Sequence, residues 1–362
     1  MKKYPVLKWT LITIVALLLI IVSFGFWFKS LIPPKNIEKT GTLVENLSYI
    51  SKNIQPFRGK ILTVVTSTHK MGSSTKKTGY ELTELARAYY VFQANGFEID
   101  IASPLGGKPP VVIDDEDMGS YDFAFLNDTT AQYKTSHTIP LDSVVAENYE
   151  AVFFVGGKGA MFDFPENTAI QEIVRAYYQS NKVIGAVCHG PAALVNVTLD
   201  NGKSLLQDKT VSGFTNEEEL LLIPEAASIF PFLLENKLVA QGARFNSGKM
   251  YLDQISHDDN LITGQNPWSV WSVAETVVQQ LGYQPKYREI TPEENAVSIL
   301  ITYHQLGSQK AKERIQKMLS EKEKSIDRLL IAKHSIIAAI QGNISDFFSI
   351  VGLVSFIKKT ED

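Results

Sequence analysis

The chain's only cysteine, Cys188, lies directly before a histidine, His189, and a glycine-proline pair. The apolar run 183–187 is typical of a buried strand, Gly190 and Pro191 end it, and 192–194 begins a helix. A cysteine at such a sharp strand-to-helix turn is presented above the carboxyl edge of a parallel sheet, and the helix N-terminus there favours a thiolate. We therefore predict that Cys188 is a nucleophile and not simply a small buried hydrophobic residue.

Three more groups are expected at the same edge of the sheet. Glu84 belongs to a predicted helix, and its carboxyl borders the apolar stripe of that helix, where a solvated glutamate is unusual. The turn Gly156-Gly157 follows a strand, and its backbone N–H groups can point at a ligand. The acidic turn 217–219 follows a later strand, although three consecutive glutamates often mark only a solvated helix start.

These groups need a sheet whose strands all end at one edge. Apolar strands alternate with amphipathic helices over residues 58–285, which predicts a doubly wound, mostly parallel α/β sheet of the flavodoxin-like class. The predicted strands are 61–65, 97–102, 122–126, 151–155, 183–187, 210–214 and a pair around 261–264. The predicted helices of this domain are 79–95, 166–180 and 266–281.

The composition excludes several classes of protein. The chain has 362 residues, 44% of them hydrophobic and 20% charged, and its net charge of -4 argues against nucleic-acid binding. One cysteine excludes an internal disulfide framework and a thiolate zinc site, so the fold must be held by its core. We expect one main domain with appendages.

The N-terminus has the pattern of a membrane anchor. Three lysines precede the uncharged stretch 11–28, which is just long enough to cross a bilayer as a helix. No small-residue cleavage site follows it, which argues against a removed signal peptide. We predict a single-pass transmembrane anchor over residues 1–30 and a linker over residues 31–57. The lysines favour a cytoplasmic N-terminus, so the catalytic domain is expected outside the cytoplasmic membrane.

The C-terminal part, residues 290–362, is predicted to be a helical extension. Residues 293–330 are rich in lysine and glutamate, which indicates a solvated helix. Two apolar patches, 329–340 and 347–357, are each too short to span a bilayer and predict a helical hairpin. The hairpin packs on the domain, on a second subunit or at the membrane surface, and the sequence leaves these alternatives open.

Six separated motifs carry a resemblance. In chain order they are T-G-Y-E-L-T-E-L-A-x-A-Y-Y-V-F, I-A-S-P-x-G-G-K-P-P, G-G-K-G-A, A-V-C-H-G-P-A-A, V-S-G-F-T-N-E-E-E and T-G-Q-N-P-x-S. The chain resembles the ThiJ/PfpI superfamily, with its glutamine amidotransferase-like fold, over about residues 58 to 285. The resemblance is to the branch of heat-shock chaperones and glutathione-independent glyoxalases.

The resemblance implies roles for four side chains. It makes Cys188 the nucleophile, His189 its partner, Glu219 the acid that orients the histidine, and Glu84 the carboxyl that hydrogen-bonds the thiol. Glu218 is adjacent, and one residue of register exchanges it with Glu219.

The backbone and the departures from the family pattern complete the expected site. The N–H groups of Gly156, Gly157 and His189 are expected to stabilise an oxyanion. Relatives commonly have histidine at the position of Lys158, and the metal-binding histidines of some members have no counterpart here.

These features predict a cysteine-dependent enzyme that acts on small reactive carbonyls. The expected activity is a hydro-lyase of the glyoxalase III type, converting methylglyoxal to lactate without glutathione, or a related deglycase. We expect a homodimer, and we expect no cofactor, metal or nucleic-acid partner. Two alternatives stay open: a cysteine peptidase or amidase, and a membrane-tethered chaperone or redox stress sensor in which Cys188 is oxidised.

Overall fold

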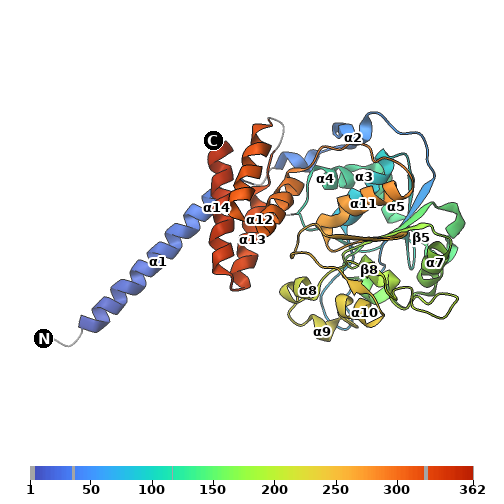
Figure 1. Cartoon of the computed structure of the whole chain (residues 1–362), viewed down its shortest axis with the longest axis horizontal. Coiled ribbons are helices and arrows are strands. Elements are labelled where there is room, and N and C mark those ends of the chain that lie inside the picture. The colour runs from blue at the N-terminus through green and yellow to red at the C-terminus, as the bar shows by residue number, and fades with distance from the viewer. Residues whose placement is uncertain (1–4, 35–36, 116, 322–324, 362) are drawn as a thin grey trace. The chain divides into compact units, whose positions relative to one another are not determined.

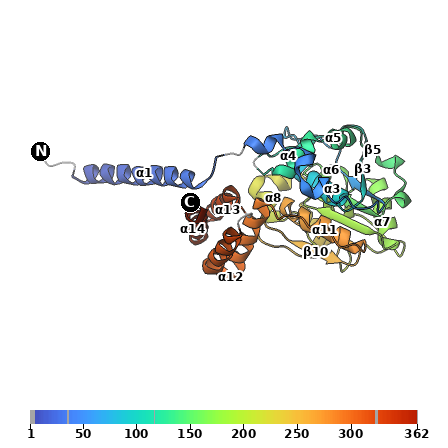
Figure 2. The same cartoon turned by 90° about the horizontal axis from the view of Figure 1, so that it is seen from above.

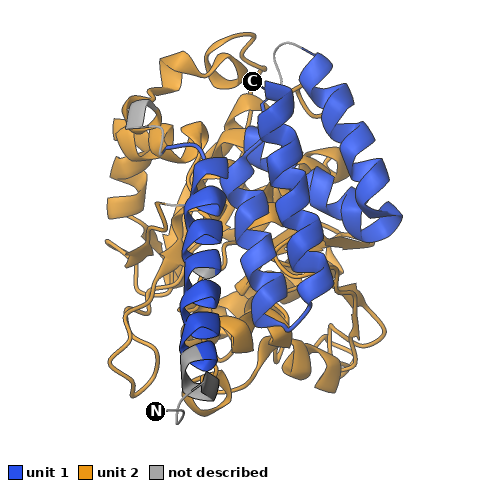
Figure 3. Ribbon diagram, turned by 90° about the vertical axis from the view of Figure 1, so that its left-hand side faces the viewer, with its two compact units in different colours: residues 1–36, 290–362 blue, residues 37–289 orange. Residues whose placement is uncertain are grey.

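The chain divides into two units. The computed structural model describes residues 5–34, 37–115, 117–321 and 325–361 (Figures 1 and 2). Contacts group Met1–Asn36 together with Ile290–Asp362 into unit 1, and Ile37–Glu289 into unit 2 (Figure 3). Unit 2 contains the predicted catalytic fold, and unit 1 contains long helices. The boundaries of anchor, linker, domain and extension given above stay predictions.

A mostly parallel sheet of seven strands forms the centre of unit 2. Its order is β10-β11-β7-β6-β1-β3-β5, and every pair is parallel except β10 with β11. The strands are β1 (Lys60–Val64), β3 (Glu98–Ser103), β5 (Ile139–Pro140), β6 (Ala151–Phe154), β7 (Val183–Val187), β10 (Ile255–Asp258) and β11 (Leu261–Gly264). This order confirms the predicted mostly parallel α/β sheet.

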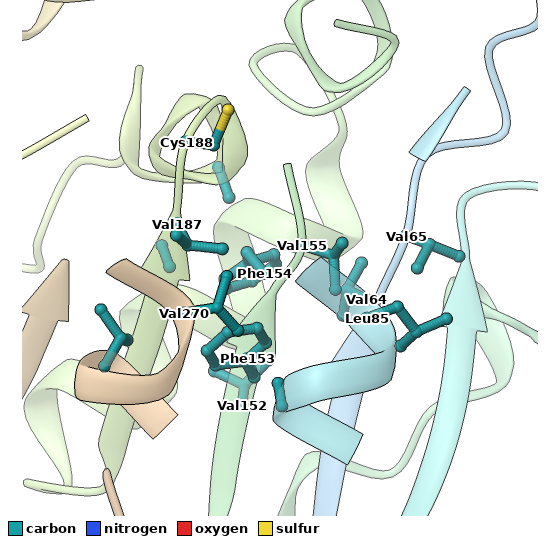
Figure 4. Packing of buried hydrophobic residues seen from close by; sticks show 14 of the residues in the cluster. Val64, Val65, Leu85, Val152, Phe153, Phe154, Val155, Val187, Cys188 and Val270 are labelled. Carbon is teal, nitrogen blue, oxygen red and sulfur yellow. The ribbon is translucent and has the colours of Figure 1, made fainter. Parts of the chain in front are cut away.

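Buried side chains on both faces hold the sheet between helices. Successive strand residues point to opposite faces, so Phe153 packs on Phe92 of one helix while Phe154 packs on Phe164. Figure 4 shows Cys188 directly beyond Val187, at the end of this packed layer. The longer helices of the unit are α3 (Leu82–Ala94), α4 (Ser120–Asn127), α5 (Thr129–Ser136), α7 (Thr168–Gln179) and α11 (Val270–Gln280).

Smaller elements surround this framework. The strand predicted over 210–214 is shorter in the structure and lies outside the central sheet. It is β8 (Thr210–Val211), which pairs with β9 (Arg244–Phe245) in a two-stranded sheet. A second two-stranded sheet joins β2 (Tyr80–Glu81) to β4 (Val111–Val112). The short helices are α2 (Ser48–Ser51), α6 (Ala160–Asp163), α8 (Asn216–Leu222), α9 (Ala226–Ile229) and α10 (Leu234–Ala240).

The predicted strand over 122–126 is wrong, because these residues belong to helix α4. The backbone N–H of Gly119 donates to the carboxylate of Asp122 at 2.8 Å, which satisfies a backbone group at the helix start. The same carboxylate forms a buried ion pair with Arg87 of α3 at 3.0 Å. A partner that lies 35 positions earlier in the chain therefore stabilises the helix, and the short apolar run does not reveal it.

Unit 1 contains α1 (Pro5–Leu31), α12 (Pro292–Ser320), α13 (Arg328–Ile340) and α14 (Ile344–Glu361). The predicted C-terminal hairpin corresponds to α13 and α14, which pack on each other and on α12. Gly307 interrupts α12 with a φ of 85°. The Arg314 guanidinium donates to the Ser298 hydroxyl, so the two arms of α12 fold back on each other. One helical stretch, Trp9–Leu31, is long and apolar enough to cross a membrane, as judged by length and composition.

Candidate active site

Cys188 directly follows β7 and precedes a short helix, so it lies at the strand-to-helix turn that the sequence predicts. Cys188 has a φ of 58°, which a residue other than glycine adopts rarely. Its N–H donates to the Gly264 carbonyl at 2.9 Å, and its own carbonyl accepts from the Phe214 N–H at 2.8 Å. These bonds tie the elbow to the neighbouring strand β11 and to the chain that follows β8.

The helix expected after the elbow is only a five-residue 3₁₀ helix, Gly190–Leu194. So short a helix carries little of the dipole that a long α-helix would direct at the sulfur. Burial raises the pKa of the Cys188 thiol, and the Glu84 carboxylate raises it further. The positive charge of Lys158 acts in the opposite direction. The helix after the elbow is therefore shorter than predicted, and its effect on the thiol stays a prediction.

His189 connects the sulfur to an acid. Its Nδ1 lies 3.3 Å from Cys188 Sγ, and its Nε2 lies 2.5 Å from Oε2 of Glu219. Both side chains are buried, and the Phe214 ring lies 4.5 Å from the imidazole, centre to centre. Burial raises the pKa of Glu219, but the adjacent His189 outweighs burial and holds this pKa below its usual value. An ionised Glu219 fixes the imidazole and can stabilise its protonated form.

Glu84 lies close to Cys188, because a Cβ on Gly156 would lie 2.6 Å from Oε2 of Glu84 and 2.8 Å from Cβ of Cys188. The Glu84 side chain is fully buried in the first turn of α3, and Oε2 accepts the Gly156 N–H at 2.7 Å. Burial raises the pKa of Glu84 to about 8, although hydrogen bonds from Cys188 and Gly156 act against the rise. The carboxyl is therefore mostly protonated at neutral pH. Oε1 of this carboxyl has no hydrogen-bond partner among the described residues.

The backbone donors expected for an oxyanion separate into two kinds. The N–H of Gly156 is already engaged by Glu84, so the expectation that it binds an oxyanion is wrong. Among the described residues, the N–H groups of Gly157 and His189 donate to no protein acceptor. Gly157 has a φ of 98°, and a Cβ at this position would lie 2.4 Å from the Gly79 carbonyl oxygen. Only glycine fits this turn.

The carboxylate of Glu218 belongs to a separate hydrogen-bond network, so Glu219 and not Glu218 contacts His189. Oε2 of Glu218 accepts from the N–H and the hydroxyl of Thr215, at 3.0 and 2.9 Å. Its Oε1 accepts from the Tyr251 N–H at 2.7 Å, the Gln265 amide at 3.0 Å and the Asn266 amide at 2.9 Å. We call this carboxylate and its donors from Thr215, Tyr251, Gln265 and Asn266 the clamp. We did not predict it from the sequence. The spacing Thr215-x-x-Glu218 is a capping-box pattern and was the available signal.

The clamp leads to a prediction for Glu218→Gln. Glutamine keeps one acceptor oxygen but points an NH₂ group at N–H donors, so buried donors lose their partners. We expect the free energy of unfolding to fall by roughly 2–4 kcal/mol, from charge-assisted hydrogen bonds worth about 1.5–3 kcal/mol each. Urea denaturation measures the loss. The exposed neighbour Glu217 supplies the control, because Glu217→Gln should leave the midpoint nearly unchanged. Equal midpoints for both variants would contradict the clamp.

Lys158 provides positive charge close to the site. Its ammonium lies 6.0 Å from the centre of the Phe214 ring, which itself packs on His189. The pKa of Glu81 is raised to about 8, chiefly by burial and also by the charge of Glu84, while Lys158 acts against the rise. The sequence did not single out Glu81 as part of this cluster. Among the described residues, no group of three or more His, Cys, Asp or Glu side chains could hold a metal ion.

Comparisons with known proteins agree with the resemblance of the motifs. A model of the DJ-1/PfpI family matches residues 75–221. Glutathione-independent glyoxalase hsp3102 of Schizosaccharomyces pombe is 30% identical over 218 residues, which are 57% of this chain and 90% of that protein. Glutathione-independent glyoxalase HSP31 of Saccharomyces cerevisiae is 31% identical over 237 residues, which are 61% of this chain and 98% of that protein.

A solved structure extends the comparison to the fold. The crystal structure of Rapid Encystment Protein 24 KDa from Francisella tularensis is 38% identical and superposes with a TM-score of 0.59. The match covers 62% of this chain and 99% of the Francisella chain. An α/β fold with a cysteine elbow, together with relatives that match over nearly their whole length, shows that the chain belongs to the DJ-1/PfpI family.

Proposed function

We propose that this chain is a glutathione-independent glyoxalase that converts methylglyoxal and water to lactate. The observation that carries the proposal is the contact of the Cys188 sulfur with His189 Nδ1 at 3.3 Å, with the buried carboxyl of Glu84 close to the same residue. The hydrogen bond between His189 and Glu219 adds an acid that can stabilise an imidazolium. Relatives named as glutathione-independent glyoxalases support the same reaction class.

The first step forms a bond between sulfur and carbon. His189 accepts the thiol proton, and the Cys188 thiolate attacks the aldehyde carbon of methylglyoxal. The carbonyl π electrons move to the aldehyde oxygen, where the N–H groups of Gly157 and His189 are the available donors. The imidazolium then returns its proton to this oxygen, which completes a hemithioacetal.

The remaining steps move a proton and add water. Neutral His189 removes the proton from the carbon bound to sulfur, and the hydroxyl proton on that carbon moves to the neighbouring oxygen. The imidazolium then protonates the resulting enediolate on the neighbouring carbon. This transfer oxidises the aldehyde carbon and reduces the ketone carbon, so it needs no external oxidant or reductant. The product is a lactoyl thioester of Cys188. Water then attacks the thioester, releasing lactate and the thiol.

A substrate panel tests the proposal on the full chain in detergent. We expect methylglyoxal to disappear and lactate to form in equal amounts, without glutathione and without stimulation by added glutathione. Glyoxal serves as the second carbonyl, and chromogenic peptides and amides test the cysteine hydrolase alternative. Peptide or amide hydrolysis without lactate formation would overturn the glyoxalase assignment in favour of that alternative.

We also propose that α1 crosses a membrane as an uncleaved anchor. The stretch Trp9–Leu31 has a mean hydropathy of 2.7 over its best window, and none of that window is buried within the protein. Such a surface is unfavourable in water and suits a bilayer core. The homodimer and the extracytoplasmic position of the catalytic domain stay predictions.

A further inference from the structure

Large apolar side chains are exposed at one end of the C-terminal helices. Ile336 and Ile340 end α13, Ile344 and Phe348 begin α14, and each is about half exposed or more, between 48% and 65%. The members of each pair are four residues apart and therefore lie on one face of their helix. We call these four residues and the turn 341–343 between them the hairpin tip.

A second turn lies at the same end of the unit. Tyr303 lies just before the break in α12 at Gly307. Its hydroxyl donates at 2.7 Å to Asp346, which lies between Ile344 and Phe348 of the hairpin tip in sequence. Leu306, next to this break, is 65% exposed and adds to the apolar surface. Asp346 also accepts the amide of Asn343, so its carboxylate has partners within the protein.

Charge is sparse along the hairpin. Between Lys333 and Lys358 the sequence contains no lysine or arginine, and Asp346 is its only acidic residue. Surfaces in contact with water normally carry interspersed charges, and contiguous exposed apolar patches mark interaction sites. The hairpin tip therefore has the surface of an element that leaves water.

Contacts between α1 and α14 indicate whether the hairpin tip lies against lipid or against a second copy of the chain. The Phe24 ring of α1 lies 6.0 Å from the Phe347 ring and 6.4 Å from the Phe348 ring, centre to centre. At the other end of α14, the Lys358 ammonium donates to the Ser30 carbonyl at 2.8 Å. The tip thus lies beside the apolar part of α1, whereas Lys358 lies beside its C-terminal end.

These contacts set a depth. Phe24 precedes Leu31, the last residue of α1, by seven positions, which is about 10 Å along a helix. Interfacial helices bury their apolar faces about 5–10 Å into the boundary between headgroups and acyl chains. At such a depth the exposed isoleucines meet acyl chains, and Lys358 and Lys359 lie at the level of the headgroups, where cationic side chains are favourable.

We propose that the hairpin tip inserts into the leaflet of the bilayer next to α1, so that its occupant is lipid. The inference rests on the proposal that α1 crosses the membrane. A second copy of the chain is the other possible cover for the tip. Lipid is favoured because the surface of α1 at the same level is itself exposed and apolar, which places acyl chains around Phe24 and hence around its partners on α14.

A fluorescent probe on the tip tests the insertion. The full chain carries Cys188→Ser, so that a cysteine introduced by Ile344→Cys is the only site for an environment-sensitive nitrobenzoxadiazole label. Ser320→Cys is the matched control, because Ser320 is exposed and lies 13 residues beyond the break at Gly307. Both labelled proteins are reconstituted into phosphatidylcholine vesicles, with or without lipids that carry a nitroxide on the acyl chain.

The expected result separates the two positions. Iodide in the buffer should quench the label at 344 about tenfold less than the label at 320, because an ion enters hydrocarbon poorly. The nitroxide lipids should quench the label at 344 only. Equal iodide quenching at both positions overturns the proposal. Protection from both quenchers overturns it in favour of a second copy as the cover.

An alkaline carbonate wash distinguishes failure of the tip from failure of the anchor. Protein that stays with the vesicles and shows iodide quenching at 344 has an inserted α1 and a solvated tip. Protein that is washed away contradicts the crossing of α1 and, with it, the insertion of the tip.

Discussion

Cys188→Ser is expected to lower the kcat for methylglyoxal by about a hundredfold or more, because a serine hydroxyl in this site stays protonated and is a far weaker nucleophile than a thiolate. The change replaces one atom, so the backbone of the elbow, with its φ of 58°, needs no rearrangement. The hydrogen bonds of residue 188 to Gly264 and Phe214 use only backbone atoms and are kept. The variant should therefore unfold at the same urea concentration as the native chain.

Lactate formation and urea denaturation measure the two parts of this prediction on the same samples. Glu217→Gln is the matched control, because this exposed side chain lies on the acidic turn but outside the clamp formed by Glu218. More than about one per cent residual activity in Cys188→Ser would contradict the nucleophile assignment. Cys188→Ala addresses the chaperone alternative. A holdase should keep its suppression of client aggregation in this variant, whereas a glyoxalase should lose turnover.

The strands that the sequence predicted best are those buried on both faces. Ala151–Phe154 and Val183–Val187 are short continuous apolar runs bounded by turn residues, which is the pattern of a buried strand. The run at 122–126 also looks apolar, but a distant arginine and a local cap make it a helix. Short elements whose state depends on a long-range ion pair lie beyond what local periodicity can predict.

The candidate site, like the strands, could be predicted from the sequence only in part. Cys188 and His189 are adjacent in sequence, so their proximity needed no tertiary information. The choice between Glu218 and Glu219 depends on donors from Tyr251, Gln265 and Asn266, which lie 33 to 48 positions further along the chain. A one-residue register decides which carboxylate faces the histidine, and only packing of these later segments fixes it.

The hydrogen bond of the Gly156 N–H also depends on a distant segment of the chain. Its N–H meets Glu84 from 72 positions earlier in the chain, so a turn that looks open in the sequence has one donor occupied. Backbone N–H groups in a glycine turn are satisfied by whatever acceptor the fold brings to them.

Glu84 variants should change the ionisation of the thiol in a defined order. In Glu84→Gln, the amide oxygen can still accept the Gly156 N–H, while the NH₂ group donates to the sulfur at every pH. In Glu84→Leu no donor remains. A hydrogen bond to a charged group is worth about 1.5–3 kcal/mol, so the thiol pKa of the leucine variant should exceed that of the glutamine variant by about 1–2 units.

The native chain should follow the glutamine variant at low pH and depart from it as Glu84 ionises. Below about pH 8 the carboxyl of Glu84 is mostly protonated, and a protonated carboxyl is expected to donate to the thiolate. Above this pH its negative charge lies beside the sulfur and opposes thiolate formation. The alkylation rate of native Cys188 by iodoacetamide should therefore rise less steeply above pH 8 than that of Glu84→Gln. Glu84→Gln should keep much of the turnover at neutral pH, and Glu84→Leu should lose it in proportion to its thiolate fraction.

Stability provides a second readout with a sign that can be worked out. The pKa of Glu84 is about 8 in the folded chain and 4.5 for an unperturbed carboxyl, so between these values the folded state holds a proton that the unfolded state releases. The free energy of unfolding of the native chain should then fall as pH rises from 4.5 to 8, relative to Glu84→Gln, which does not titrate. Urea denaturation across this range measures the difference. Equal alkylation rates in all three proteins from pH 5 to 9, together with parallel stability curves, would show that Glu84 neither holds this proton nor acts on the sulfur.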